Sequence, residues 1–237
     1  MSASARFDYV LGIADDALIL GHRLSEWCGH APLLEEELAL ANIGLDLIGE
    51  ARALYDHAGA LEGKGRDQDQ FAYRRDAAAY RNLLLVEQPN GDFAMTIARQ
   101  CLYSAHAALL WRELATSGDA TLAGIAAGAR HEAAYHLRHA GGWLIRLGDG
   151  TQESHRRAQA AVDALWPYTA EMFEDAPAAL RAEWDNNVAA VLAEASLTRP
   201  ADGWMQSGGR RGRHSEHLGH ILAELQFLQR AYPNAQW

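Results

Sequence analysis

The chain has 237 residues with a hydrophobic content of 49% and a charged content of 22%, which indicates a folded protein and excludes a disordered one. Its 21 basic and 31 acidic residues give a net charge of −10, which disfavours nucleic-acid binding. With only Cys28 and Cys101, a disulfide framework is excluded and a cytoplasmic location is expected. Asp15 and Asp16 interrupt the apolar N-terminal run, and no apolar stretch reaches the ~18 residues of a membrane span, so neither a signal peptide nor a membrane protein is expected.

Helix-forming residues, mainly Ala, Leu, Glu and Arg, fill long segments that are separated by short breaks at Gly and Pro. In chain order, the expected helices are 5–28, 33–61, 67–86, 92–116, 119–147, 151–174, 178–196 and 214–231. Long helices with short connections predict an all-α antiparallel bundle, which we expect to form one domain over residues 1–237.

The segment 33–61 is apolar around nearly its whole circumference, which predicts a central, buried helix. Asn42, Asp46 and Glu50 nevertheless recur there at intervals of four and form one polar stripe. Two interpretations remain open. The stripe is either structural, with interhelical partners such as an Arg facing Asp46, or it belongs to a metal or substrate site in the bundle core.

A di-iron centre in such a bundle needs two Glu-x-x-His pairs and two further Glu residues, all pointing inward. The chain departs from this pattern: Leu47 precedes Glu50 by three residues, and Ala133 precedes His136 by three. The segment from Phe93 to Arg112 contains no Asp or Glu. The sequence therefore predicts the architecture of a carboxylate-bridged oxygenase without its iron ligands.

Two histidine patterns suggest metal sites less strongly. His131 and His136 are five residues apart, so they diverge by ~140° around a helix and do not form a zinc motif. His214, His217 and His220 are spaced by three and can share a helix face. This second cluster is interpreted either as a metal site or as the start of a helix that Ser215 or the preceding loop caps.

The loop before that helix carries the one basic cluster that stands out in this acidic chain, Arg210, Arg211 and Arg213, set between glycines. It is interpreted as a solvated connection, as a contact with an acidic partner surface, or as a site for the phosphates of coenzyme A.

Five blocks of the sequence resemble the C subunits of bacterial ring-1,2-phenylacetyl-CoA epoxidases. They are residues 25–32, 38–52, 82–100, 135–151 and 212–230, and the resemblance runs from about Leu11 to Trp237. It implies a ferritin-like helical subunit of a multicomponent monooxygenase that epoxidises the ring of phenylacetyl-CoA in aerobic phenylacetate breakdown. In that family the di-iron centre belongs to the A subunit, which the C subunit pairs with and supports.

The resemblance therefore implies a non-catalytic structural subunit without its own cofactor, in a hetero-oligomer with the A subunit. Trp204 and Trp237 are candidate anchors of the interface. Two other hypotheses remain: a metal-binding oxygenase subunit in its own right, and a helical module whose core stripe binds a ligand.

Overall fold

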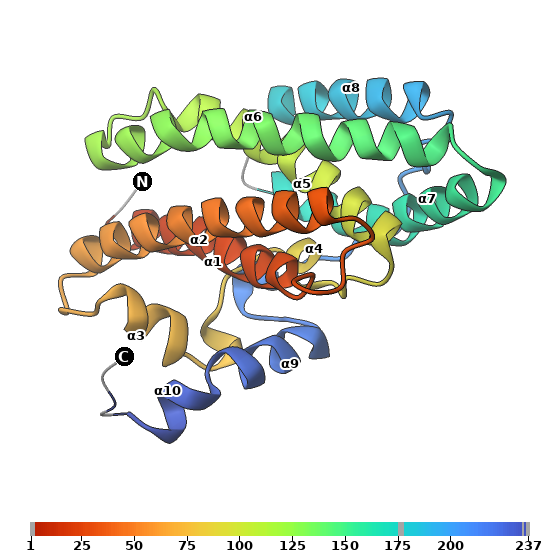
Figure 1. Cartoon of the computed structure of the whole chain (residues 1–237). Coiled ribbons are helices and arrows are strands. Elements are labelled where there is room, and N and C mark those ends of the chain that lie inside the picture. The colour runs from red at the N-terminus through yellow and green to blue at the C-terminus, as the bar shows by residue number, and fades with distance from the viewer. Residues whose placement is uncertain (1–2, 175–177, 234, 236–237) are drawn as a thin grey trace. The chain divides into compact units, whose positions relative to one another are not determined.

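The structure is a computed structural model that describes residues 3–174, 178–233 and 235. All regular secondary structure in these ranges is helical (Figure 1), so the prediction of an all-α protein is confirmed. The chain divides into two compact units, residues 1–88 with 208–237 and residues 89–207. The expectation of a single domain over residues 1–237 stays a prediction.

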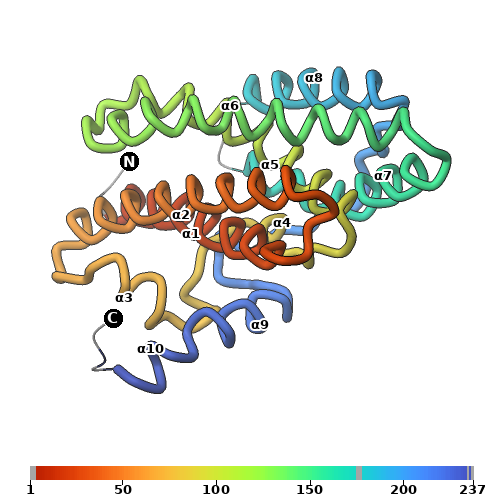
Figure 2. The backbone as a smooth tube through the Cα atoms, in the orientation of Figure 1, coloured from red at the N-terminus to blue at the C-terminus, as the bar shows by residue number. Residues whose placement is uncertain are grey.

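The first unit is built on two long helices that pack along each other, α1 (Ala3–Ser25) and α2 (Leu34–Glu62). The tube in Figure 2 shows that they run in opposite directions. Shorter elements from both ends of the chain complete this unit: α3 (Gln68–Tyr73), η1 (Ala77–Ala79), α4 (Leu84–Glu87), η4 (Gly209–Arg211), α9 (Glu216–Leu225) and α10 (Phe227–Ala231). The C-terminal α9 contacts η1 and α4, so segments more than 120 residues apart in the sequence share one core.

The second unit centres on another long pair, α5 (Phe93–Leu114) and α6 (Ala120–Gly148). Both helices also contact the two shorter ones, α7 (Gln152–Leu165) and α8 (Ala178–Glu194). Two short 3₁₀ helices follow α7, η2 (Trp166–Tyr168) and η3 (Ala170–Phe173). Trp184 lies fully buried in this unit, where its indole donates a hydrogen bond of 3.0 Å to the carbonyl of Leu102.

Side-chain caps explain where α5, α6 and α7 of the second unit begin. Asp92 accepts from the backbone N–H of Met95, and Asp119 accepts from two N–H groups at the start of α6. Thr151 and Ser154 form a reciprocal capping box at α7. Such caps satisfy N–H groups that have no partner within the helix, so these starts could be predicted from the sequence.

Three of the expected helices are wrong in extent. The segment 214–231 is divided at Gln226 into α9 and α10. The segment 67–86 is not continuous but consists of α3, η1 and α4. The segment 151–174 leaves α-helical geometry after Leu165 and continues as the 3₁₀ turn Trp166–Tyr168, which contains Pro167. A proline within an α-helix removes a hydrogen bond and clashes with the preceding turn.

The expectation that 33–61 is a fully buried central helix is also wrong. On α2, Leu34, Leu38 and Leu45 are 70%, 58% and 66% exposed. The helix that is buried on almost every side is α5, which the sequence pattern did not single out for burial. Its buried face includes polar residues that mask the apolar pattern. No helix in the described residues is both long enough and apolar enough to cross a membrane.

Candidate functional site

The four positions that resemble iron-ligand positions are all buried. Leu47 and Glu50 lie on α2, and Ala133 and His136 lie on α6. The aliphatic side chains of Leu47 and Ala133 offer no donor atom to a metal. Glu50 and His136 each have an interaction partner and are not free side chains.

The buried polar residues of α5 are neutral or cationic. Thr96, Gln100 and Ser104 follow one another at intervals of four, and the Gln100 amide donates to the Ser104 hydroxyl at 3.0 Å. Arg99 is fully buried and donates to Asn90 at 2.6 Å. Iron in such bundles requires carboxylate ligands, and this helix presents none between Phe93 and Arg112. Within the described residues no group of three or more His, Cys, Asp or Glu side chains could hold a metal ion. This donor set does not fit a di-iron centre.

The polar stripe of α2 does not lie in the core along its whole length. Asn42 is exposed, Asp46 is half-buried and Glu50 is buried. The prediction of a core position is therefore wrong for Asn42. Asp46 and Glu50 both have interaction partners. The neighbour Leu45, which suggested burial of Asp46, is itself exposed.

A buried cluster of ionic side chains, which is not among the sites predicted from the sequence, holds the first unit together. Asp15 of α1 is fully buried and binds the guanidinium of Arg75 through two hydrogen bonds, one of them 3.0 Å long. It also accepts from the Tyr55 hydroxyl at 2.6 Å and from the backbone N–H of Arg81 at 2.8 Å. Four donors therefore satisfy one carboxylate, which is the condition for burying a charge without a large penalty.

The neighbouring Asp16 is held in the same manner by the far end of the chain. Arg210 donates to its two oxygens at 2.6 and 3.1 Å, and the backbone N–H of Leu83 donates at 2.7 Å. Burial raises the pKa of Asp16 to about 7, and the opposing effects of Arg210 and the Leu83 N–H do not cancel that rise. Gly12 leaves room for the guanidinium, because a Cβ there would lie 2.7 Å from Arg210 Nη1.

Glu87, the third carboxylate of this cluster, fixes the start of α9. One oxygen accepts from the backbone N–H of Ser215 at 2.7 Å, and the other lies 2.9 Å from His214 Nδ1. The second ring nitrogen of His214 lies 3.1 Å from the carbonyl oxygen of Tyr80. Because both ring nitrogens face acceptors, His214 is held as the imidazolium. Burial lowers its pKa, but the hydrogen bonds to Glu87 and Tyr80 and the charge of Glu87 outweigh burial and raise the pKa above its ordinary value.

These contacts correct two expectations. The sequence places Arg210 on a loop surface, but its side chain binds a buried carboxylate of its own unit. Ser215 occupies the cap position of α9 without a capping side-chain bond, and the Glu87 carboxylate supplies the cap instead. The metal interpretation of the three histidines gains no support, since His214 is used in this contact and His220 is exposed.

The remaining candidates lie at the surface or outside the described residues. Arg211 and Arg213 are exposed, and Trp204 is 76% exposed. Trp237 lies outside the described residues. His131 is exposed while His136 is buried, which agrees with the divergence expected from their spacing.

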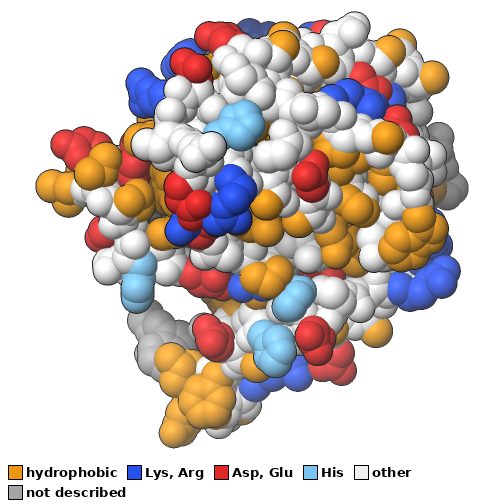
Figure 3. Space-filling view, turned by 90° about the vertical axis from the view of Figure 1, so that its right-hand side faces the viewer, with side chains coloured by type: hydrophobic (Ala, Val, Ile, Leu, Met, Phe, Trp, Pro, Cys, Tyr) orange, Lys and Arg blue, Asp and Glu red, His pale blue; other side chains and the backbone are white. Residues whose placement is uncertain are grey.

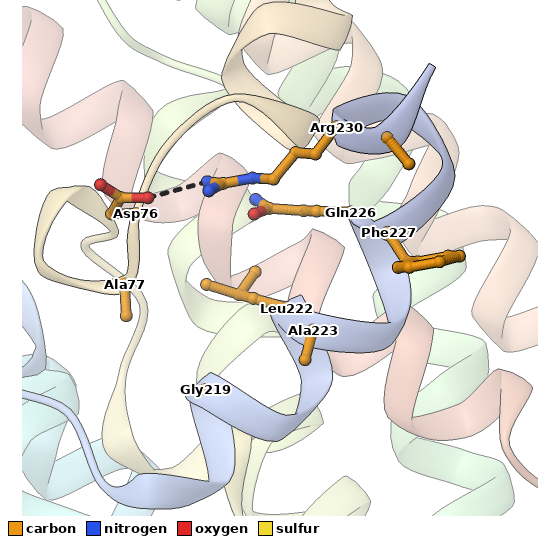
Figure 4. A pocket seen from close by; sticks show the side chains of 9 residues that line it. Asp76, Ala77, Gly219, Leu222, Ala223, Gln226, Phe227 and Arg230 are labelled. Carbon is orange, nitrogen blue, oxygen red and sulfur yellow. Dashed lines mark hydrogen bonds and ion pairs between the residues drawn. The ribbon is translucent and has the colours of Figure 1, made fainter. Parts of the chain in front are cut away.

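A shallow groove of about 530 Å³ runs beside α9 and α10 (Figure 4). Arg230 reaches across it to Asp76 at 2.9 Å, so its two charged residues pair with each other. The Gln226 amide donates to the carbonyl oxygens of Ala72 and Arg75, both at 3.0 Å. The polar groups of the groove thus fasten α9 and α10 to the rest of the unit.

The sequence does contain one signal for the ionic cluster. Two adjacent carboxylates interrupt an otherwise apolar helix from Val10 to Leu20, and charged residues in such a run are buried only if they are paired. Their arginine partners lie 60 and 194 residues away along the chain. No local pattern links residues at those separations.

The ionic cluster predicts a pH dependence of stability. His214 and Asp16 both have raised pKa values, so the folded state binds more protons than the unfolded state between about pH 4 and the folded-state pKa values. The stabilisation from His214 is complete below its ordinary pKa of 6.5 and is lost as the pH rises through the raised value. We expect His214→Gln to destabilise the protein more at pH 6 than at pH 8, as measured by denaturant unfolding.

Burial lowers the pKa of His22, which also makes stability depend on pH. Because the variant and the parent both contain His22, comparing them at each pH cancels its contribution. An equal loss at both pH values would show that folding does not change the proton affinity of His214, and a larger loss at pH 8 would show that His214 is bound as the neutral imidazole.

Comparisons with known proteins agree with this architecture. A family described as "Phenylacetic acid catabolic protein" matches residues 1–237. A relative from Escherichia coli (strain K12), the C subunit of 1,2-phenylacetyl-CoA epoxidase, is 48% identical over 243 residues, covering 97% of this chain and 98% of that protein. With a match over the full length and nearly half of the residues identical, the chain belongs to the phenylacetic acid catabolic protein family, whose fold is ferritin-like.

Proposed function

We propose that this chain is the C subunit of a 1,2-phenylacetyl-CoA epoxidase, a monooxygenase complex of phenylacetate breakdown in the cytoplasm. In this proposal it binds and supports the catalytic A subunit and holds no di-iron centre of its own. The identity to the Escherichia coli relative supports the assignment to this complex. The aliphatic residues Leu47 and Ala133 stand at two of the four ligand-like positions, and α5 carries no Asp or Glu between Phe93 and Arg112. Both observations support the structural role.

The observation that carries the subunit role is an apolar stripe on the surface of α2. Leu34, Leu38 and Leu45 are spaced by four and seven residues and therefore share one side of the helix. Three leucines more than half exposed on one helix face are costly in water and typical of a surface that another protein covers. On the face that Figure 3 shows, hydrophobic side chains lie exposed among charged ones. We infer that the α2 stripe contacts the A subunit.

Replacing two of these leucines tests the subunit role. We expect Leu38→Asp with Leu45→Asp to weaken the complex with the A subunit by at least about 100-fold, because two buried anchors would be lost and two charges desolvated. The melting temperature should stay within a few degrees, since both side chains are exposed. Co-purification and sedimentation velocity of the co-expressed pair measure the effect.

Phe227→Asp with Leu228→Asp is the matched control. These two side chains are 64% and 47% exposed on α10 and carry the same change of charge. An A subunit that binds the α2 variant as tightly as the parent would refute the proposed interface. Two irons retained per chain after chelation and desalting of the isolated protein would refute the structural role.

A further inference from the structure

The outward side of α6 carries a basic and aromatic surface. His131, Tyr135, Arg138, Gly142 and Arg146 are separated by three or four residues and therefore lie along one side of the helix. We call these five residues the α6 basic face. All are exposed except Gly142, which is half-buried.

The two arginines of this face are not neutralised within the described residues. The guanidinium carbon Cζ of Arg138 lies 5.5 Å from the ring centroid of Tyr135, and that of Arg146 lies 5.2 Å from the ring centroid of Trp143. Neither forms an ion pair with any carboxylate in the described part of the chain, whereas Arg156 and Arg157 of α7 both pair with Glu153. A cation–π contact of this kind holds a guanidinium over the ring face and leaves N–H groups available to a carboxylate or phosphate.

The Trp143 ring that lies against Arg146 is itself held in place by another helix. Trp143 packs edge-on against Phe93 of α5, with 5.2 Å between the ring centroids. An aromatic ring that is held in place reduces the entropy lost when the arginine above it binds a partner. The α6 basic face is thus partly preorganised for an anionic surface.

Glycines on the same side of α6 have no explanation within this chain. A Cβ at Gly124, Gly128 or Gly142 would meet nothing within 4 Å, and none of the three adopts a positive φ. A glycine inside a helix costs ~1 kcal/mol relative to alanine, so neither packing nor backbone geometry accounts for these residues. They do allow the backbone of another molecule to come close.

We propose that the α6 basic face, with Gly124 and Gly128 beside it, binds an acidic helix of a further protein component of the epoxidase complex. The proposal rests on the proposed function but concerns a different set of residues from the α2 stripe. The glycines provide the close approach, and Arg138 and Arg146 provide the charge that fixes the partner's register.

The dimensions and charge of the surface favour this occupant. Arg138 and Arg146 are ~12 Å apart along the helix axis, and Gly124 extends the surface to ~33 Å, which is longer than one small anion can bridge. A net charge of −10 disfavours a nucleic acid. A second copy in a symmetric contact would bring the two basic faces together, where like charges repel.

The first test immobilises the complex of this chain with the A subunit. Each of the remaining epoxidase components is then titrated onto this complex at about 50 and about 300 mM salt. We expect Arg138→Glu with Arg146→Glu to weaken binding of one component by about tenfold or more, chiefly at low salt, while pairing with the A subunit is unchanged. Lys64→Glu with Arg156→Glu is the matched control. Their side chains are 73% and 67% exposed and carry the same change of charge, and we expect parental binding.

Gly128→Leu gives a second test that does not depend on charge. Gly128 is exposed and a Cβ there would meet nothing within 4 Å, so we expect the melting temperature of the isolated chain to stay equal or rise. Binding of the same component should nevertheless fall by about tenfold or more, because the partner helix can no longer approach. If Gly128 instead has a structural role, Gly128→Leu will lower the melting temperature of the isolated chain.

Two results would overturn the inference. One is parental binding of every component by both α6 variants at both salt concentrations. The other is loss of pairing with the A subunit in the α6 variants, which would assign this face to the A subunit itself. If the parent chain does not pair with the A subunit, the proposed function fails and not this inference. Each component is then titrated against the isolated parent chain and the isolated α6 variants. A loss of binding of about tenfold or more in the variants supports the inference, and parental binding overturns it.

Discussion

Removing the carboxylate of Asp15 is expected to destabilise the protein by about 3–5 kcal/mol, because it leaves the guanidinium of Arg75 buried without its counter-charge. The Arg75 side chain is only 5% exposed, and Asp15 is fully buried. Asp15→Ala also removes the acceptor of the Tyr55 hydroxyl and of the Arg81 N–H. A loss of this size corresponds to a melting temperature lower by on the order of 10 °C. Denaturant unfolding and a thermal scan measure both quantities.

Arg112→Ala is the control for this prediction, since Arg112 forms an ion pair with Glu183 in which both side chains are roughly half exposed. We expect it to cost less than about 1 kcal/mol, because water and salt screen exposed pairs. The double variant Asp15→Ala with Arg75→Met should be more stable than Asp15→Ala alone, since no charge is then left unpaired. If Asp15→Ala unfolds within about 1 kcal/mol of the parent, the cluster does not hold the first unit together.

The second large effect is expected at Gly148, the last residue of α6. A Cβ at this position would lie 2.1 Å from the carbonyl oxygen of Ala195 and 2.9 Å from its Cβ. The backbone at Ala195 cannot easily retreat, because the N–H of Leu197 is bonded to Leu192 and Ser196 already has a positive φ of 57°. We expect Gly148→Ala to destabilise the protein by about 3 kcal/mol, the upper end of the usual cost of overpacking.

Gly142→Ala on the same helix provides the comparison, since its Cβ would meet nothing within 4 Å. The same chemical change should there be neutral or stabilising by up to about 1 kcal/mol. The two alanine variants should therefore have opposite signs in thermal unfolding. Equal stabilities would mean that the end of α8 yields to the added methyl group.

Local sequence patterns are enough to predict the helical architecture and most of the helix ends. Helix-forming residues between Gly and Pro breaks predict α1, α2, α5, α6 and α8 to within a few residues. The starts of α5, α6 and α7 are encoded by local caps such as Asp92, Asp119 and Thr151. These signals are readable because capping groups and the N–H groups they bind lie within three residues of each other. The comparison of Leu47, Glu50, Ala133 and His136 with iron-ligand positions also rests on a local signal, the i, i+3 spacing, and stays a prediction.

The conformation of residues 74–83, by contrast, depends on tertiary contacts. The sequence favours a helix there, but its backbone groups find partners elsewhere in the first unit. The N–H groups of Arg81 and Leu83 donate to Asp15 and Asp16, and Gln226 donates to the carbonyl of Arg75. Each such bond replaces one that a continuous helix would have made, so the segment unwinds without leaving these groups unsatisfied.

The role of Arg210 likewise follows from the packing of distant segments. A glycine-rich loop with three arginines has the composition of a solvated surface, and Arg211 and Arg213 are indeed exposed. Arg210 differs because the fold brings it to Asp16, a buried carboxylate 194 residues earlier in the chain. Local composition determines whether a segment is polar, but the position of a buried counter-charge depends on which distant helices pack together.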